Sequence, residues 1–170
     1  MAAPRSFVAG TATAVAPVAA IPTTAAHFAL WNGEEVGGKT YTITSVGFTT
    51  TTSAGATIIL QQLAHCSVAR IPLITGTAAT AVRATDGIPG GSKAVVASAV
   101  TIVNANGLWH PVGSSFNTAA LTATIASGGW TYVKGMYRVP PGGVFSLATL
   151  CSAAGSAACQ SYVTWEEEQI

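Results

Sequence analysis

Charged residues are scarce in this chain. It has 7 Lys and Arg and 6 Asp and Glu among 170 residues, for a net charge of +1, whereas about a quarter of an average soluble chain is charged. Nucleic-acid binding depends on clustered Lys and Arg that displace counterions from phosphates. No such cluster occurs here, so we expect no nucleic-acid partner.

Long apolar stretches are also missing. A membrane-spanning helix needs about 20 consecutive apolar residues. The longest run, Ala94–Val103, is interrupted by Ser98 and Thr101. Residues 1–26 carry Gly, Thr and Pro within their apolar part, which makes a poor signal peptide. We therefore expect neither membrane association nor export.

Sequence motifs for catalysis, phosphate binding and metal binding are absent. The chain contains no GxSxG, no CxxC and no HxxxH, and it has no GxxxxGK[ST] placed between a strand and a helix, since almost no helix is expected. The adjacent Glu34 and Glu35 would point to opposite faces of a strand, so they cannot flank a glycosidic bond. His65-Cys66 is the one adjacent His/Cys ligand pair and lacks zinc-site spacing, and His27, His65 and His110 have no convincing partner for a catalytic triad. We predict that the protein is not an enzyme and uses no metal or cofactor.

The three cysteines leave two alternatives. Cys151 and Cys159 bracket a loop of small residues that can bring two strand ends into disulfide range. A protein that stays in a reducing compartment keeps its thiols free. Because we find no export signal, free buried thiols are the favoured alternative, and Cys66 is expected in the core.

Small residues dominate what is present, with 32 Ala, 23 Thr, 18 Gly and 13 Ser. Residues 1–26 are rich in Ala and Thr and contain Pro4, Pro17 and Pro22. Proline disfavours both a regular helix and a central strand. We predict that residues 1–26 form an extended arm that is ordered by lying on another subunit.

From residue 27 to residue 170, short apolar or alternating segments recur between turn residues, which is typical of an all-β sandwich. In Leu121–Ile125 aliphatic residues alternate with Thr, so hydroxyl groups would cover the solvent face. We predict one antiparallel, jelly-roll-like β-sandwich domain over 27–170 with about eight to ten short strands. The expected strands are His27–Trp31, Lys39–Thr49, Ala56–Cys66, Ala78–Arg83, Lys93–Val103, Leu108–Val112, Ala119–Ala126, Trp130–Arg138, Gly143–Leu150 and Ser161–Glu167.

The second expected strand contains a change of phase. Its apolar positions shift from Tyr41 and Ile43 to Val46 and Phe48, so an extra residue, a β-bulge, is predicted near Ser45. Glycines between the strands predict turns that contain positive-φ residues. The expected turns lie at Asn32-Gly33, Gly37-Gly38, Asp86-Gly87, Gly90-Gly91, Asn106-Gly107, Gly128-Gly129 and Pro141-Gly142-Gly143.

The scarcity of charge also bears on the surface. Soluble designed domains carry about 25–35% charged surface residues, which this composition cannot supply. We infer that other subunits cover much of the exterior, most simply in a symmetric homo-oligomer. The run Glu166–Glu168 is either a solvated end or an acidic tip that docks on a basic patch of a partner.

Three segments carry a resemblance to a known family. They are WNGEEVGGKTYTI from Trp31, YRVPPGGVFSL from Tyr137 and the closing SYVTWEEEQI. The chain resembles small virion proteins of tailed bacteriophages, in particular the β-sandwich or jelly-roll capsid decoration (cement) proteins. The resemblance covers most of residues 27–170. It implies a homotrimer on the outer capsid surface, made in the host cytoplasm, that binds the major capsid protein and stabilises its lattice.

The resemblance implies contact residues and no catalytic ones. Trp31 and Trp109 flank turns and are expected as anchors, whereas Trp130 and Trp165 lie in alternating strands and are expected in the core. The expected interaction residues are Arg5, Phe7, Pro17, Pro22, Trp31, Trp109, Glu166, Glu167 and Glu168.

An alternative function is host recognition by a head or tail fibre, with a glycan as the ligand. Exposed aromatic rings beside Asn side chains would form such a site. The residues that come closest are Asn104, Asn106, Trp109 and His110.

Overall fold

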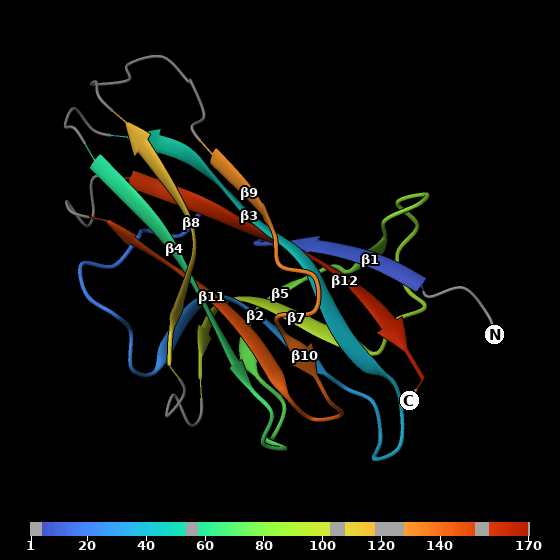
Figure 1. Cartoon of the computed structure of the whole chain (residues 1–170). Helices are drawn as coiled ribbons and strands as arrows, with labels where there is room; N and C mark the ends of the chain where they lie inside the picture. Colours follow the sequence, from blue (N-terminus) through green and yellow to red (C-terminus); the bar gives the residue numbers. More distant parts are fainter. Residues whose placement is uncertain (1–4, 54–57, 103–107, 118–127, 152–156, 170) are drawn as a thin grey trace.

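A computed structural model describes residues 5–53, 58–102, 108–117, 128–151 and 157–169. They form twelve strands in two antiparallel sheets packed face to face (Figure 1), so the predicted all-β sandwich is confirmed. Among these residues no helix exists that could cross a membrane. The strands are β1 (Arg5–Gly10), β2 (Ala25–Asn32), β3 (Thr40–Ser53), β4 (Ile58–Ser67), β5 (Thr75–Ala79), β6 (Val82–Arg83), β7 (Ala94–Thr101), β8 (His110–Asn117), β9 (Gly128–Tyr132), β10 (Arg138–Val139), β11 (Val144–Cys151) and β12 (Ala157–Glu168).

The chain crosses repeatedly between the two sheets. Sheet A has the order β10-β3-β12-β1-β6, with β9 also paired to β3, and sheet B has the order β5-β7-β2-β11-β4-β8. The connections β2–β3, β3–β4, β10–β11 and β11–β12 each pass from one sheet to the other. Each of these pairs of consecutive strands is therefore divided between the two sheets, and in sheet B β11 lies between β2 and β4.

The inner faces of the two sheets make the main core. Phe28, Leu30 and Phe145 from sheet B pack with Tyr41 and Trp165 from sheet A, and all five side chains are fully buried. Along β12 buried and half-buried residues alternate without interruption, which is the two-residue period of a strand with one face on the core. Each of the five fully buried side chains named above contributes about 2–3 kcal/mol to the free energy of unfolding, because it is removed from water.

The N-terminal segment belongs to the sandwich, and the prediction of an arm lying on another subunit is wrong for it. Arg5–Gly10 is strand β1, which pairs along β12, and its Phe7 is fully buried. Further on, Val15 bridges β12 and Val18 bridges β11. Pro17 and Pro22 lie between β1 and β2, so neither removes a backbone donor from a strand.

The β-bulge predicted near Ser45 is confirmed. Ser45 pairs with Thr164 and Ile43 pairs with Trp165, so Thr44 is the extra residue on β3. The expected turns supply left-handed glycines at Gly37, Gly87, Gly90, Gly91 and Gly142.

Two expected strands are each divided in the structure. Ala78–Arg83 is split between β5 of sheet B and β6 of sheet A, and Trp130–Arg138 is interrupted after Tyr132 by a turn in which Gly135 has φ 83°. These divisions, together with β1, raise the number of strands to twelve. Apolar patterning cannot show where a chain leaves one sheet for another. The expected strand Ala119–Ala126 lies outside the described residues.

Candidate functional site

Every carboxylate side chain of the chain takes part in an ion pair. All 7 basic and 6 acidic side chains lie within the described residues, and among them Arg5 is the one without an ion-pair partner. The pairs, with their N–O distances, are Lys39 with Glu167 (3.0 Å), Arg70 with Glu35 (3.8 Å), Arg83 with Asp86 (2.9 Å), Lys93 with Glu34 (3.3 Å), Lys134 with Glu166 (3.8 Å) and Arg138 with Glu168 (3.5 Å).

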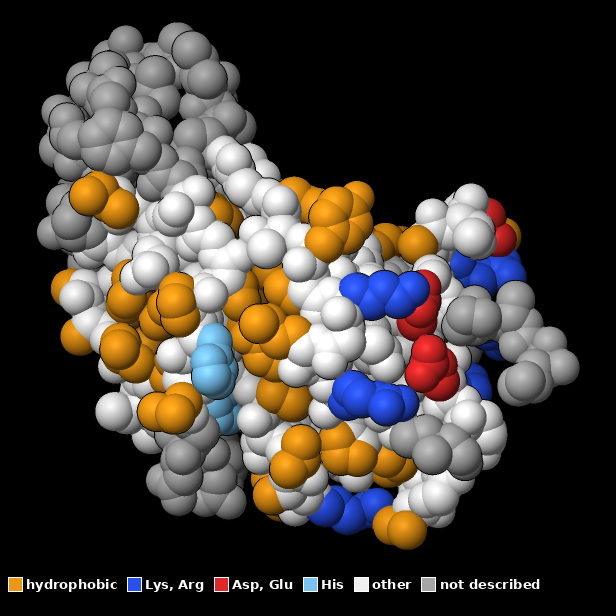
Figure 2. All heavy atoms as spheres, viewed as in Figure 1, with side chains coloured by type: hydrophobic (Ala, Val, Ile, Leu, Met, Phe, Trp, Pro, Cys, Tyr) orange, Lys and Arg blue, Asp and Glu red, His pale blue; other side chains and the backbone are white. Residues whose placement is uncertain are grey.

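These charges are gathered toward one end of the sandwich. Four stretches carry no Lys, Arg, Asp or Glu, namely 6–33, 40–69, 94–133 and 139–165. Residues 6–33 include most of β1 and all of β2, residues 40–69 include β3 and β4, and residues 139–165 include β11 and most of β12. In each of these stretches the chain leaves the charged end along one strand and returns along the next. We call the end where β3 finishes and β4 begins the charge-free end. In Figure 2 the charged side chains accordingly lie on one half of the visible face.

The acidic run Glu166–Glu168 is neutralised within the chain. Glu167 has a fully buried side chain that accepts hydrogen bonds from Lys39 Nζ, at 3.0 Å, and from the Ser92 hydroxyl. Its neighbours in sequence pair with cations on the β9–β10 turn and on β10. Docking through Glu167 is therefore excluded, because its carboxylate lies inside the molecule.

The other expected contact residues do not share one surface. Phe7 and Pro17 are buried, Pro22 is half-buried, and Arg5 is exposed at the start of β1. Trp31 is half-buried and its Nε1 donates to the Ile71 carbonyl at 3.3 Å. The expectation of contact through Phe7 and Pro17 is wrong, because both side chains fill space within the sandwich.

Trp109 is also partly covered. Its ring is half-buried, lies 5.3 Å from that of His65, and has its Nε1 buried. A glycan site with Asn104 and Asn106 cannot be assessed, since both asparagines lie outside the described residues. His110 is exposed beside Tyr137.

The two tryptophans expected in the core differ. Trp165 is fully buried, as predicted, but Trp130 is 48% exposed and the prediction for it is wrong. In β9 the inward positions are Gly129, Thr131 and Val133, so Trp130 points outward. The alternation was recognisable in the sequence, but which of its two faces lies inward was not.

Trp130 belongs to a row of residues across the outer face of sheet A. In direct register, Trp130 of β9 lies beside Gly47 of β3, Gly47 beside Tyr162 of β12, and Tyr162 beside Gly10 of β1. A Cβ added to Gly47 would collide with the Trp130 ring, and one added to Gly10 would meet the Tyr162 ring at 2.6 Å. An edge of each ring therefore lies over the backbone of its glycine neighbour.

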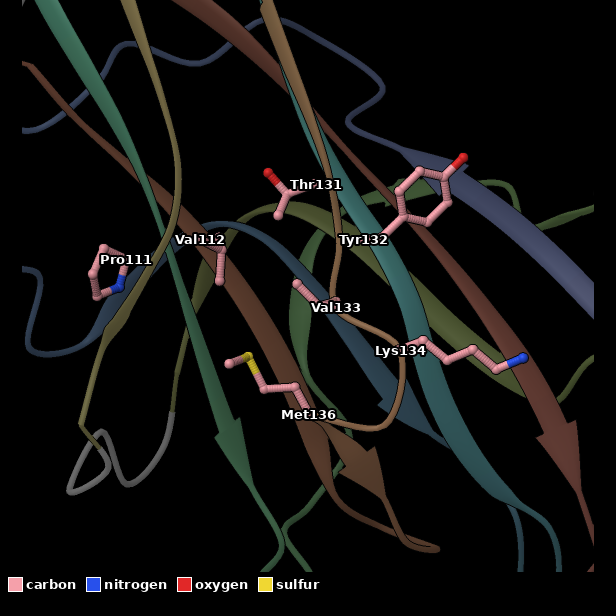
Figure 3. Close-up of a pocket in the computed structure, with 7 residues that line it drawn as sticks. All are labelled: Pro111, Val112, Thr131, Tyr132, Val133, Lys134 and Met136. Atoms are coloured by element: carbon pink, nitrogen blue, oxygen red, sulfur yellow. The ribbon is translucent and has the colours of Figure 1, made fainter.

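A hollow of about 280 Å³ lies beside this row, between β8 and the end of β9 (Figure 3). Tyr132, 83% exposed, and Lys134 project to one side, over β3, whereas Pro111 and Val112 come from β8 on the other side. Thr131, Val133 and Met136 complete the lining. No carboxylate or histidine is among these lining residues, and its titratable groups are Tyr132 and Lys134.

The buried polar groups offer little for catalysis. His65 and Ser146 are register partners on neighbouring strands, but both are sealed from solvent. Burial, and then the neighbouring His110, lower the pKa of His65; burial alone lowers the pKa of His27 to about 4. Within the described part of the chain, no three His, Cys, Asp or Glu side chains converge as metal ligands.

The cysteines are free thiols in the structure. Cys151 of β11 and Cys159 of β12 are buried in one small cluster with Phe48, Leu60 and Ala157. Burial raises the pKa of Cys159 to about 11. Cys66 is half-buried against the main core, and burial raises its pKa to about 11 as well.

Comparison with known proteins adds no relative. No protein-family model, no curated protein and no solved structure matches this chain.

Proposed function

We propose that this chain is a virion structural protein that decorates the outside of a bacteriophage capsid. It assembles as a homotrimer, binds the major capsid protein and stabilises the capsid lattice. Its binding free energy is spread over many copies, so that individually weak contacts add up through avidity.

The distribution of charge carries this proposal. All six carboxylate side chains are in ion pairs, and the stretches that make up the charge-free end contain no Lys, Arg, Asp or Glu. A surface without charge can approach a second protein without the cost of desolvating unpaired ions. The resemblance of the segments from Trp31 and Tyr137 to decoration proteins supports the trimer and the capsid as partner.

The charge-free end is therefore the surface proposed to contact other subunits. Its described part includes Ser114 on β8, which is exposed, and Ile59 on β4, which is 54% exposed. A charge placed there would have to be desolvated in the contact, at a cost of several kcal/mol. The opposite end already carries charges, so an added charge there remains in water.

Particles that contain the protein test the proposal. Mass spectrometry of purified particles should give a copy number that is a fixed multiple of the capsomer number. The Ser114→Lys variant should be recruited at least about tenfold less well, and its particles should break at a lower temperature. Val36→Lys is the matched control, because Val36 is 82% exposed between Glu35 and Gly37 at the charged end. Absence from particles, or only a few copies on each, would contradict decoration.

A further inference from the structure

We propose that the outer face of sheet A is a binding platform for neutral carbohydrate, formed by Trp130, Tyr132 and Tyr162. We call these three residues the aromatic platform. This inference does not depend on the proposed role in a capsid.

The platform is built by the pairing of aromatic residues with glycines. Gly47 and Gly10 have no side chain, so the rings of Trp130 and Tyr162 lie down on the backbone of the neighbouring strand. Trp130 leans toward β3 and Tyr162 leans toward β1, which is the same direction across the sheet. Trp130 is 48% exposed and Tyr162 is half-buried, so part of each ring remains open to solvent.

The third ring extends the surface along β9. Tyr132 is two residues beyond Trp130, so it lies on the same side of the sheet, about 7 Å away along the strand. Tyr162 is two strands from Trp130, about 10 Å away. Rings at these separations can each contact a different sugar unit of a short oligosaccharide.

Hydrogen-bonding groups without charge flank the three rings. Tyr162 Oη donates to Gln160 Oε1 at 3.0 Å, which holds the Gln160 amide beside the ring. The next row across the sheet places Ser45 and Thr164 beside Tyr132; Ser45 is buried and its hydroxyl contacts that of Thr164, so the half-buried Thr164 is the hydroxyl of this pair that can reach a ligand. Amides and hydroxyls can both donate to and accept from sugar hydroxyls.

The chemistry of these groups favours a sugar as the ligand. A pyranose ring presents C–H groups on one face and hydroxyls around its edge, and it can stack its apolar face on an aromatic ring. Lys134, two residues beyond Tyr132, is already paired with Glu166. A neutral oligosaccharide therefore matches the platform better than an acidic one does.

A protein partner fits this geometry less well. Aromatic anchors of protein interfaces are inserted into pockets of the partner. The rings of Trp130 and Tyr162 rest against the backbone of their own sheet, so neither projects as such an anchor would. Their exposed parts suit a stacked ring better.

Binding of the intact protein to a panel of soluble neutral gluco-, galacto- and manno-oligosaccharides tests this proposal. We expect at least one of them to bind, with a change in tryptophan fluorescence that disappears in Trp130→Ala. Both Trp130→Ala and Tyr132→Ala should weaken binding at least about tenfold, whereas Trp130→Phe should retain part of it. Met136→Ala is the control, since Met136 is 68% exposed in the neighbouring hollow but is not part of the platform.

Tyr132→Ala should fold normally, because the Tyr132 side chain is 83% exposed. A loss of binding in this variant therefore cannot be attributed to misfolding. Absence of binding to the whole panel at millimolar concentration would overturn the proposal. Binding of a neutral oligosaccharide that survives both alanine variants would also overturn it. If no sugar binds and the same alanine variants abolish attachment to capsids, the outer face of sheet A is a protein contact and the proposal is wrong.

Discussion

Phe7 stacks on Trp165, so the first and last strands of the sandwich share one aromatic contact. The ring centroids are 5.6 Å apart, the ring planes are inclined by 21°, and both side chains are fully buried. Tyr41 lies on the other strand next to β12, with its ring 6.3 Å from that of Trp165. Because of this contact, the N-terminal residues are part of the core.

Truncation of this contact should destabilise the whole fold. Phe7→Ala leaves a cavity beside Trp165 and should lower the free energy of unfolding by about 3–5 kcal/mol, measured by urea denaturation. Val8→Ala on the outer face of the same strand is the control and should cost less than about 1.5 kcal/mol. An unchanged midpoint for Phe7→Ala would show that β1 is dispensable.

The ion pair between Lys39 and the buried Glu167 should contribute more to the free energy of unfolding than an exposed ion pair does. Lys39→Met leaves the Glu167 carboxylate buried without its cation, which should cost about 3 kcal/mol in thermal or urea unfolding. Arg138→Met removes the partner of Glu168, which is partly exposed, and should cost less than about 1 kcal/mol. Equal effects of the two variants would contradict the assignment of Glu167 to the interior.

The packing of Trp130 over Gly47 can be tested by a double-mutant cycle. Gly47→Ala forces a Cβ into the Trp130 ring and should lower the free energy of unfolding by about 1–3 kcal/mol. In a Trp130→Ala background the same change should cost at least about 1 kcal/mol less, because the obstructing ring is gone. Strictly additive effects would mean that the ring does not lie on the glycine.

Stability should fall in mild acid because of His27. Its Nδ1 accepts a hydrogen bond from the Thr149 amide at 3.0 Å, so the ring is neutral when folded. Burial lowers the His27 pKa from 6.5 to about 4, so between these two pH values the unfolded chain binds more protons than the folded one. The free energy of unfolding should therefore decrease as the pH falls from about 6.5 to about 4.

The contribution of His27 to this decrease is about 3 kcal/mol. Urea unfolding at a series of pH values measures it, and His27→Gln should flatten the curve because Gln keeps an acceptor for Thr149 but does not titrate. His65, whose pKa is lowered mainly by burial, adds a component in the same direction. A stability that is independent of pH in this window would contradict the burial of both rings.

The thiols should be protected while the chain is folded. Cys151 and Cys159 are buried, and the raised pKa of Cys159 leaves little reactive thiolate near pH 8. Iodoacetamide should therefore label these two positions much faster in denaturant than in native buffer, as read by mass spectrometry. A mass two hydrogens lower for the untreated chain would instead show that they form a disulfide.

The sequence revealed the features that are local. Alternation of apolar residues predicted the sandwich, and the change of phase between Ile43 and Val46 predicted the bulge, because both follow from the two-residue period of a strand. Glycines such as Gly37 marked turns because they can adopt positive φ. These patterns need no knowledge of which strands are neighbours.

The features that depend on strand pairing could not be predicted. The pairing of Arg5–Gly10 with β12 joins residues more than 150 positions apart, and no local signal specifies it. For the same reason, Gly47 and Gly10 gave no sign that they lie beside Trp130 and Tyr162. Trp130 was assigned to the wrong face because the glycines before it obscure which alternate positions are inward.

Analytical ultracentrifugation of the intact protein tests most directly the claim that other subunits cover the charge-free end. The account predicts a trimer at micromolar concentration for the wild-type chain and for Val36→Lys, and dissociation toward monomer for Ser114→Lys. A wild-type protein that remains monomeric up to the highest attainable concentration, or a Ser114→Lys variant that associates as strongly as the wild type, would contradict it.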